Sequence, residues 1–104
     1  MNQNNQLLLS LSDSQFTQLA EFFRVLGDAS RVKIIAALLG ETMNVQSLAE
    51  HTGLSPSAVS HHLRSLRLMH LARSKKQGRQ VYYTLDDQHV AELFRRAADH
   101  IRHT

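Results

Sequence analysis

The sequence contains no cysteine and no tryptophan, and only one proline and four glycines among its 104 residues. Without cysteine, the chain can form neither a disulfide bond nor a metal site with thiolate ligands. This composition is compatible with the cytoplasm, where we expect the protein to work. No apolar run approaches the length of a membrane span, and residues 1–11 lack the basic flank and cleavage site of a signal peptide. We therefore expect neither membrane contact nor export.

A chain of this length forms one small domain with a limited hydrophobic core. No internal repeat, low-complexity segment or linker divides it. We expect a single domain over residues 1–104, in which residues 1–11 are flexible. Pairing with a second copy would bury more apolar surface than one chain can bury alone.

Positive charge is concentrated in one stretch, although the net charge is only +3. Six lysines and arginines lie between Arg64 and Arg79, and this stretch contains no aspartate or glutamate. A local basic stretch in a small domain favours nucleic acid over a membrane surface, because no basic amphipathic helix rich in aromatic residues accompanies it.

Apolar residues at helical spacing predict helices over residues 12–26, 29–39, 45–51 and 56–68. Side chains that can cap a helix N-terminus precede them: Ser12 or Ser14, Asp28, Asn44 and Ser55. Gly27, Gly40 and Gly53 are expected to end the first three. In the second helix we expect four residues to face the core: Val32, Ile35, Ala36 and Leu39.

The third and fourth helices are separated only by the turn 52–55, so they predict a helix-turn-helix over residues 45–68. On the second of these helices, one face is apolar: Val59, Leu63 and Leu66. The opposite face carries groups that suit base edges and phosphates in a major groove: Ser57, Ser60, His61 and Arg64. A merely solvated polar face is the alternative. The turn before it and the basic stretch after it favour DNA.

The basic stretch has the pattern of a β-hairpin over residues 71–85, with strands 71–74 and 80–85 joined by a tip at 75–79. A helix-turn-helix followed by such a hairpin is a winged helix, so the predicted fold class is mainly α with a β-hairpin wing. At the tip, three cations are expected to contact DNA phosphates: Lys75, Lys76 and Arg79. The alternative is a charged turn that protects the edge of the sheet.

Residues 85–104 predict one amphipathic helix, capped by Asp86 or Asp87. Its segment 87–103 carries four side chains that bind a borderline metal ion: Asp87, His89, His100 and His103. His89 and His100 share a helix face but lie about 16 Å apart, too far for one zinc ion to bridge. In two antiparallel copies of the helix, the Asp87 end of one meets the His100 end of the other, which gives two symmetric sites. The spacing therefore predicts a homodimer with metal across its interface.

The first and last helices are expected to build that dimer, through Phe16, Leu19, Phe23, Leu93, Phe94 and Ala97. Four nitrogen and oxygen ligands suit a closed tetrahedral site for Zn(II), with Co(II) as a substitute, whereas six-coordinate nickel needs more donors. A zinc hydrolase would need an open coordination position and a cleft, so we expect no enzyme and no small-molecule substrate. Each residue alone has a simpler explanation: Asp87 can cap the helix, and the last two histidines can interact favourably with the negative end of the helix dipole. Their joint placement favours metal.

Three motifs, LSPSAVSHHLRSLR, KKQGRQVYYTL and the Asp-x-His … His-x-x-His pattern of residues 87–103, resemble the ArsR/SmtB family of metal-sensing winged-helix repressors. The resemblance covers nearly everything from Phe22 to His103, and the last motif is similar to that of the zinc- and cobalt-responsive branch. It implies a homodimer that binds double-stranded operator DNA when metal-free and releases it when zinc binds. It also implies that each site takes Asp87 and His89 from one subunit and two histidines from the other.

The sequence departs from other branches of that family, which place cysteines near residues 43–45. This second class of site is absent here, which argues against sensing of arsenic, lead, cadmium or Cu(I), because these soft ions prefer thiolate. One alternative stays open: a winged-helix regulator whose histidine-rich last helix only dimerises or binds a protein partner, or responds to Ni(II), Co(II) or a non-metal signal. Equal DNA binding with and without zinc would support it.

Overall fold

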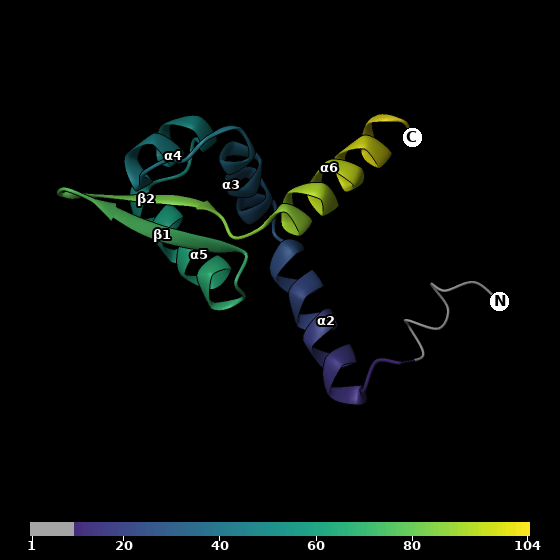
Figure 1. Cartoon of the computed structure of the whole chain (residues 1–104). Helices are drawn as coiled ribbons and strands as arrows, with labels where there is room; N and C mark the ends of the chain where they lie inside the picture. The colour runs from purple at the N-terminus through teal and green to yellow at the C-terminus, as the bar shows by residue number, and fades with distance from the viewer. Residues whose placement is uncertain (1–9) are drawn as a thin grey trace.

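The computed structural model describes residues 10–104, and the flexibility expected for residues 1–9 lies outside this part. Within residues 10–104, five helices and an antiparallel hairpin form a winged helix-turn-helix, as predicted (Figure 1). The elements are α2 (Asp13–Leu26), α3 (Ala29–Gly40), α4 (Val45–Thr52), α5 (Pro56–Leu68), β1 (Ala72–Gln77), β2 (Gln80–Leu85) and α6 (Gln88–Arg102). Among the described residues, every helix is too short or too polar to cross a bilayer.

Capping side chains set the start of each helix. Ser12 and Gln15 exchange hydrogen bonds, with the Gln15 N–H donating to Ser12 Oγ at 3.1 Å and the Ser12 N–H donating to Gln15 Oε1 at 2.9 Å. Asp28, Asn44 and Ser55 each accept a backbone N–H from three residues further on. These satisfied donors confirm the predicted caps, with Ser12 rather than Ser14 at the first helix.

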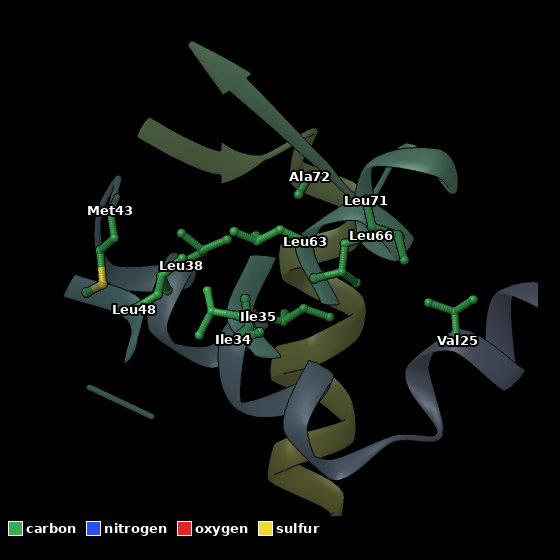
Figure 2. Packing of buried hydrophobic residues seen from close by; sticks show 11 residues of the cluster. Val25, Ile34, Ile35, Leu38, Met43, Leu48, Leu63, Leu66, Leu71 and Ala72 are labelled. Carbon is green, nitrogen blue, oxygen red and sulfur yellow. The ribbon is translucent and has the colours of Figure 1, made fainter. Parts of the chain in front are cut away.

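The core lies between α3, α4, α5 and the base of the hairpin (Figure 2). Its fully buried side chains are Ile34, Ile35, Leu48, Val59, Leu63, Leu66 and Leu71. The apolar face predicted for α5 is therefore confirmed. Because this face is buried, the polar face of the same helix is left to solvent.

The inward face predicted for α3 is partly wrong. Ile34, Ile35 and Leu38 are buried, whereas Ala36 is exposed and Val32 is only half-buried. The helix is apolar on almost every side after its first turn, so its sequence periodicity cannot select a face. Gly40 also belongs to the helix rather than ending it.

The hairpin tip is shorter than predicted. β1 continues to Gln77, which pairs with Gln80, so only Gly78 and Arg79 form the turn. Gly78 has a φ of 63°, as the first position of a two-residue type II′ turn requires. Lys75 pairs with Tyr82 and therefore belongs to the strand, as does its neighbour Lys76.

Two contacts join the hairpin to the start of the helix-turn-helix. Met43 and Tyr83 exchange backbone hydrogen bonds of 3.1 and 2.8 Å. The side-chain amide of Asn44, the cap of α4, donates to Gln80 Oε1 at 3.2 Å. These contacts hold the hairpin in a defined position relative to α4.

Helices α2 and α6 project from the body on the side opposite to the hairpin tip (Figure 1). Each buries one residue only, Val25 in α2 and Ala91 in α6. The radius of gyration is 15.5 Å, against about 13 Å for a compact domain of this length. The last helix begins later than predicted, because Leu85 ends β2 and Asp87 is the N-cap.

Candidate functional site

The outer face of α5 is open to solvent over its whole length. All four residues predicted to contact DNA are exposed: Ser57, Ser60, His61 and Arg64. Pro56 stands at the first helical position and Ser55 caps it, so the helix starts immediately after the turn. The neighbouring His62 is half-buried, and its ring lies edge-on to that of His61 with 5.6 Å between centroids. The exposed stripe has the chemistry for base-edge and phosphate contacts.

The three cations predicted for the wing are also exposed, but they do not share one face. Lys75 and Lys76 are consecutive residues of β1, and successive side chains in a strand point to opposite faces. Arg79 lies in the two-residue turn. The hairpin therefore offers positive charge on both faces and at its tip, rather than in one row.

At the start of α6, Asp87 and His89, two of the predicted metal ligands, lie close together. Asp87 Oδ1 accepts the Val90 N–H at 3.0 Å and lies 3.8 Å from His89 Nδ1. The His89 side chain is 93% exposed and that of Asp87 56%. An exposed imidazole and a carboxylate that uses one oxygen as a cap retain free electron pairs for a metal ion.

At the end of α6, His100 and His103 form the second pair. His103 Nδ1 lies 2.7 Å from the carbonyl oxygen of Asp99. Because a carbonyl can only accept, Nδ1 is the donor, and in the neutral ring Nε2 is the nitrogen that has a free electron pair. This hydrogen bond fixes the tautomer and orients the ring, as outer-shell partners of metal-binding histidines do.

Within residues 10–104 of one chain, no three metal-binding side chains come together. The two donor pairs lie at opposite ends of α6, a separation of about 16 Å between His89 and His100. Each end thus offers half of a tetrahedral set of nitrogen and oxygen ligands, which suits zinc. One chain alone cannot complete the set.

An apolar groove of about 670 Å³ runs between α2, α3 and α6. Seven large apolar side chains are exposed in the described part of the chain, and five of them lie on α2 and α6: Phe16, Leu19, Phe23, Leu93 and Ile101. Three of these five line the groove, together with Phe94, Ala97 and other residues. Clustered apolar exposure of this kind marks a contact surface.

Asp28, the N-cap of α3, lies near His62 of α5. Its carboxylate accepts the Arg31 N–H at 3.1 Å, and this hydrogen bond lowers the pKa of Asp28 below its ordinary value of 3.8. Desolvation acts in the opposite direction, and the nearby His62 lowers the pKa further. The charged carboxylate is therefore favoured by folding.

This lowered pKa predicts a pH-dependent effect of Asp28→Asn on stability. The ionised carboxylate contributes stability above its unfolded pKa, and the contribution is lost as pH falls through the lower folded pKa. We expect the variant to melt below wild type at pH 7 and the difference to shrink as pH falls below the ordinary value of 3.8. Thermal unfolding across this range tests it, with the exposed Glu50→Gln as control. A difference that is constant with pH would contradict it.

Arg67 and Arg73 belong to the basic stretch of residues 64–79, but the sequence did not predict that they and His70 surround a basic concavity beside α5. Arg67 stands three residues after Arg64 on the same helix, which was an available signal. Nothing in the sequence predicted that Arg73 and His70 would meet Arg67, because only the fold brings the start of β1 to the end of α5.

Comparison with known proteins gives four matches. The sequence model described as bacterial regulatory protein, arsR family, matches residues 28–74. The transcriptional repressor SmtB homolog of Synechocystis sp. is 44% identical over 91% of this chain and 70% of that protein. The cadmium resistance transcriptional regulatory protein CadC homolog of Staphylococcus aureus is 37% identical over 94% and 82%, respectively. The crystal structure of Rv0081 of Mycobacterium tuberculosis superposes with a TM-score of 0.81, 26% identity and coverage of 88% and 93%.

Proposed function

This chain belongs to the arsR family of bacterial regulatory proteins, and we propose that it is a homodimeric repressor that binds operator DNA when metal-free and leaves it when Zn(II) binds. The relatives are transcriptional regulators, so the chain is a regulator of transcription and not an enzyme. One observation carries the metal-responsive part. Two donor pairs lie at opposite ends of α6, and neither is completed within the described part of the chain.

In the proposed dimer, α2 and α6 of each subunit pack against those of its partner. Two observations support this arrangement: the exposed apolar side chains of these helices and the groove between them. In a single chain this apolar surface would be in contact with water, and burying it against a partner lowers the free energy. A two-fold axis perpendicular to α6 would place the two α6 helices antiparallel, as the proposed metal site requires.

The proposed metal site takes Asp87 and His89 from one subunit and His100 and His103 from the other. Bound Zn(II) would supply a cross-link between the two α6 helices, and Co(II) would substitute for it. The CadC homolog is named for cadmium resistance. The present chain has no cysteine, so its donors favour zinc over softer ions.

The proposed DNA contacts are of two kinds. Ser57, Ser60, His61 and Arg64 would enter the major groove, and their common exposed face supports this role. Lys75, Lys76 and Arg79 would contact flanking phosphates, and their exposure along the hairpin supports it.

The metal response follows from linkage between two sites. A ligand weakens DNA binding only when it binds better to the dimer shape that fits DNA poorly. The two recognition helices must reach successive major grooves about 34 Å apart. Fixing the relative position of the α6 helices changes this spacing, because α6 packs on α3 within the same body as α5.

Titration with Co(II) tests the proposed site. We expect one ion per subunit with the strong visible absorption of a tetrahedral complex, displaced by one equivalent of zinc. Because imidazole binds metal only in its neutral form, the affinity should fall as pH is lowered from 8 to 6. A weak octahedral spectrum, or an affinity that is constant over this range, would contradict the proposed ligands and favour a response to Ni(II) or to another signal.

A further inference from the structure

A second basic surface lies at the end of the recognition helix. A concavity of about 550 Å³ separates the last turns of α5 from the start of β1. Its polar lining consists of Arg64, Arg67, His70, Arg73, Ser74 and Asp86. Three arginines and one aspartate thus line this shallow depression, and its lining has an excess of positive charge.

Among residues 10–104, these three arginines have no ion-pair partner. Elsewhere in the described part of the chain, Arg24 pairs with Glu21 and Arg102 pairs with Asp99. Over the same residues 10–104, no ion pair or side-chain hydrogen bond is made by the three guanidinium groups of the concavity. Three such cations beside a single carboxylate raise the local positive potential, and this potential attracts anions.

The concavity adjoins the exposed polar face of α5 that is proposed to contact DNA, and Arg64 belongs to both. Ser60, Arg64 and Arg67 follow at steps of four and three residues, so their side chains lie along one stripe of α5. A basic residue in the last turn also interacts favourably with the helix dipole. In α5, however, the terminal carbonyls of Leu66 and Arg67 already accept the backbone N–H groups of Leu71 and His70, at 2.8 and 3.0 Å. Neutralising this helix end does not require three arginines.

His70 provides an independent observation. It has a φ of 58° and is the only described residue other than glycine with a positive φ. It occupies the position after the helix C-cap, where the left-handed conformation favours glycine. Its side chain is exposed and lines the concavity, so the core does not require it. A strained residue at a surface site indicates a function for its side chain.

We propose that this concavity binds a phosphate group of the operator backbone, with Arg67, Arg73 and His70 as its ligands. This inference rests on the proposed function, since it adds a phosphate contact between the recognition helix and the wing. Guanidinium groups bind phosphate oxygens in bidentate fashion, and the imidazole N–H adds a third donor. A free phosphorylated small molecule would present the same chemistry, and the experiment separates the two sources.

The test measures duplex binding by Arg67→Ala and Arg73→Ala as a function of salt. Each substitution removes a cation from a phosphate, so the slope of log K against log salt should fall by about 0.9 for each. Affinity should fall by the same factor for operator and for a scrambled duplex, because phosphates carry no sequence information. Lys33→Ala is the matched control, since Lys33 is an exposed cation on α3 away from this surface.

His70→Gly separates binding from folding. Glycine relieves the strain of the positive φ, so Tm should rise by a few degrees. The variant should nevertheless bind both duplexes more weakly than wild type. A residue with a purely structural role would not give higher stability with weaker binding.

Three results would overturn the inference. In the first, Arg67→Ala and Arg73→Ala leave the salt slope unchanged while Lys75→Ala lowers it. This result would show that the concavity does not contact a phosphate, and it would leave the proposed function intact. The variants could instead lose only the binding of inorganic phosphate, measured at constant ionic strength, and keep wild-type affinity for both duplexes. This result would assign the concavity to a free anion. Failure of wild type to bind any duplex would overturn both proposals.

Discussion

A mixed dimer of one Asp87→Asn/His89→Ala chain and one His100→Ala/His103→Ala chain is expected to bind one zinc ion, whereas neither parent homodimer binds any at the same concentration. In the mixed dimer, the intact first pair of one chain faces the intact second pair of the other. The opposite site loses all four ligands. Asparagine is chosen at position 87 because it keeps the N-cap hydrogen bond to the Val90 N–H.

This result is measured on dimers that carry two different affinity tags and are purified through both. Bound zinc is then quantified by competition with a chromophoric chelator. His51→Ala, which removes an exposed histidine of α4, is the control and should leave two zinc ions per dimer. A mixed dimer without zinc would show that the two pairs do not meet across an interface.

Leu93→Glu is expected to convert the dimer to a monomer and to weaken operator binding by about a hundredfold or more. Leu93 is 39% exposed in the single chain and lines the apolar groove between α2 and α6. A carboxylate there would lose its hydration when the partner covers the groove, which costs free energy. Loss of the second recognition helix removes the avidity of two linked modules, which commonly amounts to about 10²–10⁴-fold.

Sedimentation equilibrium measures the dimer, and circular dichroism checks that the variant remains helical. Val81→Glu is the matched control for assembly, because Val81 is equally exposed at 38% but lies on the hairpin. A Leu93→Glu protein that stays dimeric would place the interface elsewhere.

The sequence predicted the elements whose signals are local. The caps Ser12, Asp28, Asn44 and Ser55 were identified because a short polar side chain before an apolar periodic run has one favourable use. The exposed face of α5 followed from its apolar face, since both come from one helical period.

The errors arose where local signals were weak. In α3, apolar residues surround most of the helix, so burial of Ile34 rather than Ala36 depends on the packing of α4 and α5. In the hairpin, Lys75 and Lys76 resemble loop residues by composition, yet backbone pairing with β2 keeps both in the strand.

The candidate sites divide in the same way. The spacing of Asp87, His89, His100 and His103 can be read from one helix, and so the idea of a site shared between two chains needed no structure. The basic concavity joins Arg67 of α5 to Arg73 of β1 through the turn at His70. Only the folded chain reveals it, because the left-handed turn at His70 determines how the two elements meet.

The most direct measurement is operator affinity by fluorescence anisotropy, with zinc and with a chelator, on wild type and on His100→Ala. We expect zinc to weaken binding by wild type about tenfold or more, a coupling typical of allosteric proteins. His100→Ala should bind as tightly as metal-free wild type under both conditions. Equal affinity of wild type with zinc and with chelator would contradict a metal switch and leave a dimeric DNA-binding protein that responds to another signal.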